Sequence, residues 1–405
     1  MVKNAMLQVL ALDDAKRILL NLAHKREIST QRVPLSAVLG RVLAKNVYSN
    51  EDLPQFHRSA VDGFAVMSRD TFGSSAAQPT LLCLAGEVKM GERARFSINS
   101  GDCALVWTGG ELPDGADAMV MLEETQALSG GLVAIESASA PGRHVVFRGD
   151  DVKAGDMILS AGTRLNARDI GLLAALGIME PEVAVRPKVG ILSTGDELVT
   201  PDQTPQSGQI RDANGAMLAS ACTEAGAMAS HLGIVPDDEE KLIAAIREGA
   251  ASYDLLLLSG SSSAGAKDAA ARCLTELGEV AFHGLALKPG KPAFAGMIGD
   301  TLVVGLPGHP AAAYLVFHSL VCPLIAAMLG ESFTQRSVTA TLAQAAPSNH
   351  GREELLPVRI DNGFAEPVAL KSGLISPLTR ADGYIRIPRD TEGLPKGTLQ
   401  EVILF

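Results

Sequence analysis

Acidic residues follow several predicted strands in the second half of the chain, where their carboxylates could bind a metal ion. Asp196 and Glu197 lie in STGDEL, Asp212 in GQIRDANG and Asp237 in VPDDEE, and Asp268 closes the loop LSGSSSAGAKD. Oxygen ligands that converge from separate segments suit Mg²⁺, which proteins usually hold with one or two carboxylates plus substrate phosphate. Any one of these acids could instead be solvated or cap a helix. That alternative explains the whole set less well, because solvated carboxylates need not follow strand ends.

Two features suggest that an anion is bound near these carboxylates. Lys288 and Lys291, in LALKPGKPAFAG, are separated by Pro-Gly and form a compact positive turn in an acidic protein. A phosphate or oxyanion ligand is one interpretation of this turn, and a solvated turn is the other. The loop LSGSSSAGAKD (258–268) is rich in glycine and serine, which let backbone N–H groups approach an anion. It could equally be a ligand loop that has lost its function.

The first half of the chain contains two further candidates. Asp62, in FHRSAVDGFAV, precedes Gly63 among apolar residues, so it is a turn former or a carboxylate presented from a sharp bend. The residues alone favour the turn. Thr108, followed by Gly109 and Gly110, marks a backbone anion site or a flexible corner.

The elements that would position these residues are clearest after Lys188. Strands KVGILST, HLGIV, DLLLLS and TLVVGL alternate with helices ANGAMLASACTEAGA, EEKLIAAIREGAAS and PAAAY. This alternation predicts parallel βαβ units and a doubly wound sheet, whose ligands bind beyond the carboxyl ends of the strands. We therefore expect one rim, formed by the segments Ser193–Glu197, Pro236–Asp238, Ser259–Asp268 and Pro307–His309.

The rest of the chain is predicted to be helical at its start and β-rich elsewhere. Residues 80–150 are dense in turn signals, and residues 154–178 predict a short strand and a helix with Asn166 as N-cap. From about 332, short strands and an Asp-Asn-Gly turn at 361–363 predict a small closed β domain. The apolar run 311–330 has the length of a membrane span, but His318 and Pro323 favour a buried helix.

Length, charge and cysteine usage narrow the class of protein. A chain of 405 residues predicts two to four domains. The net charge of −11, with no basic stripe, excludes electrostatic binding to nucleic acid. The five cysteines have no metal-ligand or redox spacing, which is typical of reduced thiols in a cytoplasmic protein. The N-terminal segment lacks the layout of a signal peptide.

Taken together, the motifs resemble those of the molybdopterin molybdenumtransferase family, called MoeA in bacteria, whose eukaryotic counterpart is the C-terminal domain of gephyrin. The resemblance covers essentially the whole chain in one order: LPQF, SAVDGFAV, TGGELPDGADAMV, RGDDV, AGTRL, STGDEL, GQIRDANG, PDD, SGSSSAGAKD, LKPGKP and GLPGHP. The combination of STGDEL, GQIRDANG and LKPGKP is the most specific part.

The resemblance implies a multidomain α/β and β fold in an elongated homodimer. It assigns residues 1–45 and 150–183 to an elongated helical and mixed domain, and residues 46–149 to a small β-rich domain. Residues 184–331 would form the doubly wound, molybdopterin-binding α/β domain, and residues 332–405 a domain like a β-barrel. The cleft would be built from the α/β domain of one subunit and the small domain of the other.

The resemblance also implies a reaction. The family inserts molybdate into adenylylated molybdopterin with Mg²⁺ and releases AMP, and a molybdopterin adenylyltransferase would be a further partner. The implied catalytic residues are Asp62, Thr108, Glu197, Asp268, Lys288 and Lys291. The implied Mg²⁺ ligands are Glu197, Asp237 and Asp268. The implied cofactor-binding residues are Asp151, Ser193, Thr194, Gly195, Asp212, Gly260, Ser261, Ser263, Gly265, Pro307 and Gly308.

Several positions depart from the family pattern. His57 and Arg58 stand where the family usually has a carboxylate and an amide, and Gly284 stands where relatives often carry a lysine. The loop at 261–269 also loses a glycine and a tyrosine, and Arg148 is what remains of an arginine-rich stretch. These changes favour, as the alternative, a non-catalytic or altered-specificity paralogue that binds molybdopterin or a related nucleotide. A hydrolase of another pyrophosphate-linked cofactor is a weaker third interpretation.

Overall fold

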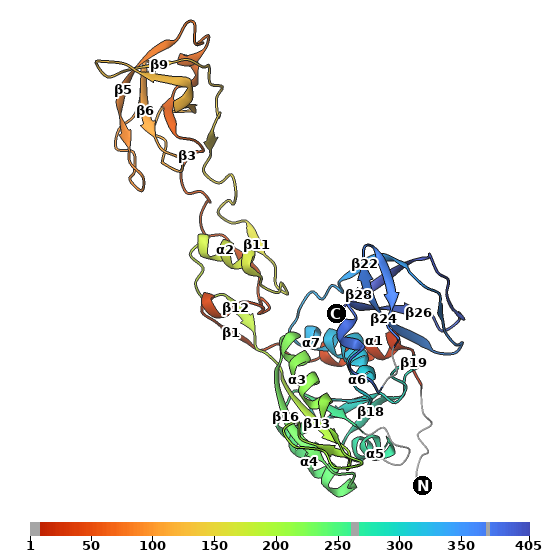
Figure 1. The fold of residues 1–405 in the computed structure, drawn as a ribbon. Helices are drawn as coiled ribbons and strands as arrows, with labels where there is room; N and C mark the ends of the chain where they lie inside the picture. The colour runs from red at the N-terminus through yellow and green to blue at the C-terminus, as the bar shows by residue number, and fades with distance from the viewer. Residues whose placement is uncertain (1–8, 261–266, 370–372) are drawn as a thin grey trace.

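The chain forms a long arm attached to a larger body (Figure 1). The computed structural model describes residues 9–260, 267–369 and 373–405, with the side chains of residues 267 and 268 outside the description. A β-rich domain lies at the far end of the arm, and an α/β domain and a β-barrel form the body (Figure 1). The predicted multidomain α/β and β fold is confirmed.

The domain at the far end of the arm, called here the distal domain, is built around one sheet. Its strand order is β7-β4-β6-β5-β9-β8, and β3 and β10 form a separate pair. The strands are β3 (Arg58–Ser59), β4 (Gly63–Val66), β5 (Thr80–Val88), β6 (Asp102–Val106), β7 (Ala118–Met121), β8 (Thr125–Ala127), β9 (Leu132–Ile135) and β10 (Val145–Val146). Apolar residues such as Phe64, Leu82 and Val120 form the core beneath the sheet.

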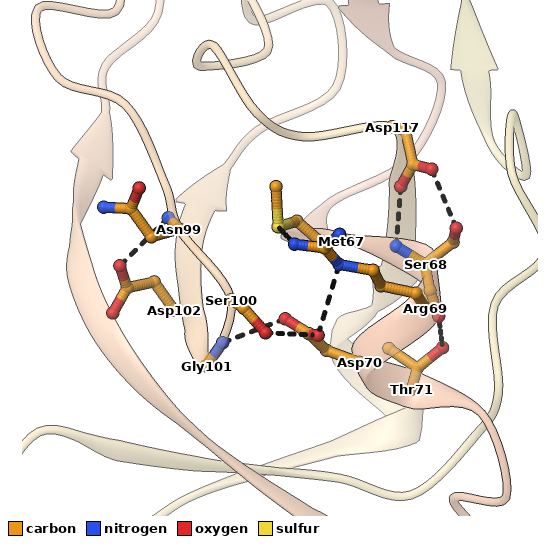
Figure 2. A network of polar contacts seen from close by, with 10 residues as sticks. All are labelled: Met67, Ser68, Arg69, Asp70, Thr71, Asn99, Ser100, Gly101, Asp102 and Asp117. Atoms are coloured by element: carbon orange, nitrogen blue, oxygen red, sulfur yellow. Dashed lines mark hydrogen bonds and ion pairs between the residues drawn. The ribbon is translucent and has the colours of Figure 1, made fainter.

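A polar network holds the end of β4, the strand that begins directly after Asp62 (Figure 2). Asp117 accepts hydrogen bonds from the backbone N–H of Ser68 at 2.6 Å and from its hydroxyl at 2.8 Å. Asp70, in the 3-10 turn Ser68–Thr71, accepts from the hydroxyl of Ser100 and from a backbone N–H in the loop before β6. Charge-assisted bonds of this kind are stronger than neutral ones, so the network fixes the loops around the sheet.

The middle of the arm is made of short strand pairs and one helix. β1 (Thr30–Arg32) pairs with β12 (Glu182–Ala184), and β2 (Val47–Tyr48) pairs with β11 (Met157–Leu159). Helix α2 (Ala167–Ala175) begins at Asn166, whose side chain forms a capping box with Asp169. This confirms the N-cap expected from the sequence.

The α/β domain has a six-stranded sheet of order β16-β13-β17-β21-β20-β18. Its strands are β13 (Lys188–Thr194), β16 (Met228–Val235), β17 (Leu255–Ser259), β18 (Glu279–His283), β20 (Phe294–Ile298) and β21 (Thr301–Leu306). The first four in spatial order are parallel, whereas β20 and β18 form an antiparallel edge. The helices are α3 (Ala213–Glu224), α4 (Glu239–Ser252), α5 (Lys267–Leu277), α6 (Pro310–Val316) and α7 (Cys322–Met328). Small strands β14 (Leu198–Val199) and β15 (Ile210–Arg211) pair beside the sheet.

The C-terminal domain is a closed barrel. Its strands are β22 (Ser337–Leu342), β24 (Glu353–Asp361), β25 (Phe364–Pro367), β26 (Gly383–Ile387) and β28 (Leu399–Leu404), and a β24–β26 pairing closes the ring. The strand β19 (Leu287–Lys288) pairs with β24 and ties the α/β domain to the barrel, and β23 (Ala346–Pro347) pairs with β27 (Gly393–Leu394). The expected hairpin turn is confirmed, with positive φ at Asn362 and Gly363.

The N-terminal helix α1 (Leu12–Ala23) and the apolar helix lie between the sheet and the barrel (Figure 1). Residues Pro310–Met328 form one helix that is long and apolar enough to cross a membrane, but 83% of its most apolar window is buried in the body. The burial supports the expectation of a core helix.

Candidate functional site

The carboxyl ends of the parallel strands meet at one edge of the sheet, as the sequence predicted, and we call this edge the rim. Ser193 and Thr194 end β13 and are buried. Gly195 follows with φ +147°, and a Cβ built there would lie 2.6 Å from the carboxylate of Glu197. The positive φ favours glycine here, and a Cβ would push the Glu197 carboxylate away from the end of the strand.

The first turn of α3 ties three segments of the rim together. Asp212 caps the helix by accepting the backbone N–H of Gly215 at 2.9 Å. The side-chain amide of Asn214 donates to the Ser259 hydroxyl and to the Gly308 carbonyl, both at 2.8 Å. Asn214 therefore connects α3 with the ends of β17 and β21. Sequence patterns do not reveal the role of Asn214, because its two partners are 45 and 94 positions away.

Buried oxygen atoms without hydrogen bonds gather at this rim. They are the Thr194 hydroxyl and the amide oxygen of Asn214, which have no hydrogen-bond partner in the described part of the chain. One buried carboxylate oxygen of Asp212 lies 3.1 Å from Nε2 of His231, which can donate to it when that nitrogen carries a proton. Buried polar atoms are nearly always paired, because an unpaired one costs free energy. These atoms therefore indicate a ligand that offers hydrogen-bond donors here.

The small-residue loop begins at Gly260, which is packed tightly against the rim. Its φ is +115°, and a Cβ there would lie 2.0 Å from the Thr194 carbonyl oxygen. The predicted residues Ser261, Ser263 and Gly265 lie outside the described residues, as does the side chain of Asp268. Their binding roles stay predictions.

Three carboxylates lie close together beyond β13 and β16. The backbone N–H of Asp237 donates to the carboxylate of Asp196 at 3.1 Å. Burial raises the pKa of Asp237, and the neighbouring charges of Asp196 and Glu197 raise it further. An all-oxygen donor set of this kind fits Mg²⁺. Among the residues whose side chains are described, however, no group of three or more potential ligands is close enough to hold a metal, so the predicted ligand set with Asp268 remains untested.

The two lysines line a cavity of about 740 Å³ between the α/β domain and the barrel. Lys288 pairs with Glu354 at 3.1 Å, while Lys291 is exposed on the same wall. Pro307 and Gly308 of the rim also line the cavity, so the cavity and the rim are continuous. Arg352 adds a third cation from the barrel. Arg352 was not among the predicted site residues, because the barrel was not expected to contribute to the site.

The remaining predicted residues lie elsewhere. Asp62 accepts the backbone N–H and the hydroxyl of Thr108, both at 2.7 Å, and these two bonds lower the pKa of its carboxyl group. Both residues are exposed in the distal domain, and Asp151 is exposed at its junction with the arm. Figure 1 places this domain far from the α/β domain of the same chain. A single chain does not bring the two groups of residues together.

Two departures from the family pattern have structural roles. The ring of His57 accepts the backbone N–H of Arg148 at 3.1 Å, and the Arg148 guanidinium pairs with Asp52 at 2.6 Å. Gly284 has φ +101°, a conformation that a lysine side chain would strain. The glycine there is therefore consistent with the local backbone.

Comparisons with known proteins match the chain along most of its length. Family models match as MoeA N-terminal region (domain I and II) at 10–177, probable molybdopterin binding domain at 190–327, and MoeA C-terminal region (domain IV) at 339–405. Molybdopterin molybdenumtransferase 2 of Mycobacterium tuberculosis is 32% identical, over 91% of this chain and 94% of its own. The chain belongs to the MoeA family. Another family member, the molybdopterin molybdenumtransferase of Nostoc, is 36% identical over 77% of this chain and 73% of its own.

A solved MoeA structure also agrees in overall fold. The molybdopterin biosynthesis moeA protein of Pyrococcus horikoshii OT3 aligns with a TM-score of 0.88 and 31% identity. The alignment covers 98% of this chain and all of the other. The arm, the α/β domain and the barrel are therefore the domains of a MoeA protein.

Proposed function

We propose that this chain is a molybdopterin molybdenumtransferase, which inserts molybdate into adenylylated molybdopterin and releases AMP. The observation that carries the proposal is the rim itself. The buried oxygens of Thr194 and Asn214 have no hydrogen-bond partner among the described residues, and Asn214 also bonds to Gly308, which lines the same cavity as Lys288 and Lys291. A substrate with a donor-rich ring system and anionic phosphates matches both features.

The cations that line the cavity would stabilise negative charge on the substrates and on the departing AMP. Molybdate is a dianion, and cleavage of the phosphate linkage leaves negative charge on the departing AMP. Lys291 and Lys288, supported by Arg352, would stabilise that charge in a site partly closed to water. The carboxylate of Asp62, kept ionised by its two bonds from Thr108, would orient substrate from the distal domain.

We further propose a homodimer in which the rim of one subunit faces the distal domain of the other. The support is that Asp62 and Thr108 lie far from the rim in their own chain (Figure 1). We also propose a cytoplasmic location and a molybdopterin adenylyltransferase as the partner that supplies the adenylylated substrate. None of the five cysteines, all of them in the described part of the chain, forms a disulfide, which is consistent with that location.

Release of AMP tests the proposed reaction. The purified chain is incubated with adenylylated molybdopterin and Mg²⁺, with and without molybdate. We expect AMP to appear only when molybdate is present. Tight binding of the nucleotide with no AMP in either case would overturn the proposal and favour a non-catalytic binding protein.

Mg²⁺ is proposed to bind Glu197 and Asp237. Because the pKa of Asp237 is raised, its proton must leave before the metal binds, so Mg²⁺ affinity should rise with pH through a window above the usual value of about 3.9. At a concentration of 100 times its Kd, Mg²⁺ should stabilise the folded chain by about 2.7 kcal/mol at neutral pH. Calorimetric titration from pH 7 downward would measure this dependence.

Two variants serve as the test and its control. Asp237→Asn should abolish the effect of Mg²⁺, whereas Asp300→Asn, in the turn at the opposite end of the sheet, should leave it intact. Equal Mg²⁺ affinity in the Asp237→Asn chain and the unmodified chain would refute the site.

A further inference from the structure

The distal domain carries the only tryptophan of the chain, and this residue lies beside Asp62. Trp107 directly follows β6, and Asp62 directly precedes β4. The antiparallel register of the two strands pairs Gly63 with Val106, so Asp62 and Trp107 lie opposite each other at the end of the ladder. Opposite residues of an antiparallel pair share one face of the sheet, with Cβ atoms about 5 Å apart. The indole and the carboxylate are therefore neighbours.

The indole of Trp107 is held in place by its edge. Its Nε1 atom donates to the carboxylate of Glu87 on β5 at 2.9 Å. The only hydrogen-bonding atom of the side chain is thus already used, and what remains is the flat apolar ring. Trp107 is partly exposed at the surface of the domain. A ring fixed in this way, with part of its area still accessible, is suited to stack on another flat ring.

The carboxylate of Asp62 has one oxygen to spare. Both hydrogen bonds from Thr108, at 2.7 Å, go to Oδ1 of Asp62. Oδ2 has no partner in the described part of the chain, and the side chain is exposed. An ionised carboxylate only accepts hydrogen bonds. A ligand that reaches this place must therefore bring a donor.

The proposed substrate has two flat ring systems, a pterin and an adenine. The pterin carries its 2-amino group next to a ring N–H, so one edge presents donors alone. The adenine presents its amino donor beside acceptor nitrogens, and a carboxylate would face one of their lone pairs. Both rings stack equally well on an indole, because stacking tolerates any flat heterocycle. The carboxylate beside the indole therefore favours the pterin.

We propose that Trp107 and Asp62 form the subsite for the pterin ring, with the indole stacked on the ring and Oδ2 of Asp62 accepting from its amino edge. The inference rests on the proposed function, which supplies a substrate that contains a pterin. The adenine is left for the rim, where the unpaired oxygen of Asn214 can accept from its amino group. The phosphates between the two rings would then lie at the lysines of the cavity.

Two small pterin analogues test the subsite without turnover. The probes are 6-hydroxymethylpterin and 6-hydroxymethyllumazine, which has a carbonyl oxygen in place of the 2-amino group. Calorimetric titration of the full chain should show saturable binding of one pterin per chain. The lumazine should bind about tenfold more weakly, because its carbonyl oxygen would face the carboxylate. Asp62→Asn should remove this preference.

Variants of Trp107 test the stacking. Trp107→Leu keeps an apolar side chain without a ring, and should weaken 6-hydroxymethylpterin about tenfold. Trp107→Phe keeps a ring and should cost only about twofold. Phe72→Leu is the matched control, since Phe72 is an aromatic residue of the same domain, is 65% exposed and lies beyond the other end of β4. It should leave the pterin affinity unchanged.

The outcomes separate this inference from the proposed reaction. Equal pterin affinity in the Trp107→Leu and unmodified chains, or equal affinity of the unmodified chain for the two probes, would overturn the subsite. Weaker binding of AMP by Trp107→Leu, with unchanged binding of the pterin, would assign the indole to the adenine and overturn it as well. Molybdate-dependent release of AMP together with either result would leave the transferase standing and reject the subsite alone.

Discussion

A mixed dimer of one Asp62→Asn subunit and one Lys291→Met subunit should regain about half of the unmodified rate of AMP release, because one of its two shared clefts is intact. A dimer in which both subunits carry the same one of these substitutions should release AMP about 10²–10³-fold more slowly than the unmodified protein. Co-expression with two different affinity tags would isolate the mixed dimer for assay.

The reason for this recovery is the geometry of the chain. Asp62 is in the distal domain and Lys291 is at the wall of the cavity in the body, far apart in one subunit (Figure 1). If each cleft combines the body of one subunit with the distal domain of the other, one cleft of the mixed dimer receives both unmodified residues. The other cleft receives both substitutions.

The matched control reverses the arrangement with the same two changes. A dimer of an unmodified subunit and a subunit that carries both Asp62→Asn and Lys291→Met should be inactive, because each cleft then contains one substitution. Recovery in this control and not in the first dimer would show that each cleft belongs to a single chain. Lys396→Met changes an exposed lysine in the Pro-Lys-Gly turn at 395–397 and should change neither result.

Local sequence patterns predicted the elements that carry the rim. Each strand of the parallel part is a short apolar run with a helix after it, and parallel strands leave their carboxyl ends at one edge. The capping box of Asn166 and Asp169 and the turn at Asn362 and Gly363 are local as well. These features depend on neighbours within a few residues, which a sequence displays directly.

Contacts between distant segments could not be predicted in this way. The partner of Lys288 is Glu354, which lies 66 positions later in the sequence. The two residues are brought together by the pairing of β19 with strand β24 of the barrel. The antiparallel edge strands β18 and β20 were also missed, because Glu279–His283 is short and of mixed polarity and Phe294–Ile298 is short and has a central glycine. For Asp62, the residues alone favoured a turn former, and the bonds from Thr108 became visible only in the folded domain.

Substitution of Gly260 by alanine should destabilise the rim strongly, because the added methyl group would collide with the backbone of the neighbouring strand. Gly260 directly follows β17, has φ +115°, and would place a Cβ 2.0 Å from the carbonyl oxygen of Thr194 at the end of β13. Both strands are held by the parallel ladder that pairs Ser193 with Ser259. The backbone must therefore move, and it carries Thr194 and the rim with it.

We expect Gly260→Ala to lower the free energy of unfolding of the α/β domain by about 3 kcal/mol or more, from the clash and the strained φ together. Urea denaturation followed by circular dichroism, with hydrogen exchange of the β13 and β17 amides, would measure the loss. Gly299→Ala is the matched control in the same sheet, since its φ of +56° is also positive but nothing lies within 4 Å of the added Cβ. That control should cost only about 1–2 kcal/mol. If both variants unfold at the same urea concentration, the close approach of Gly260 to Thr194 does not hold the rim together.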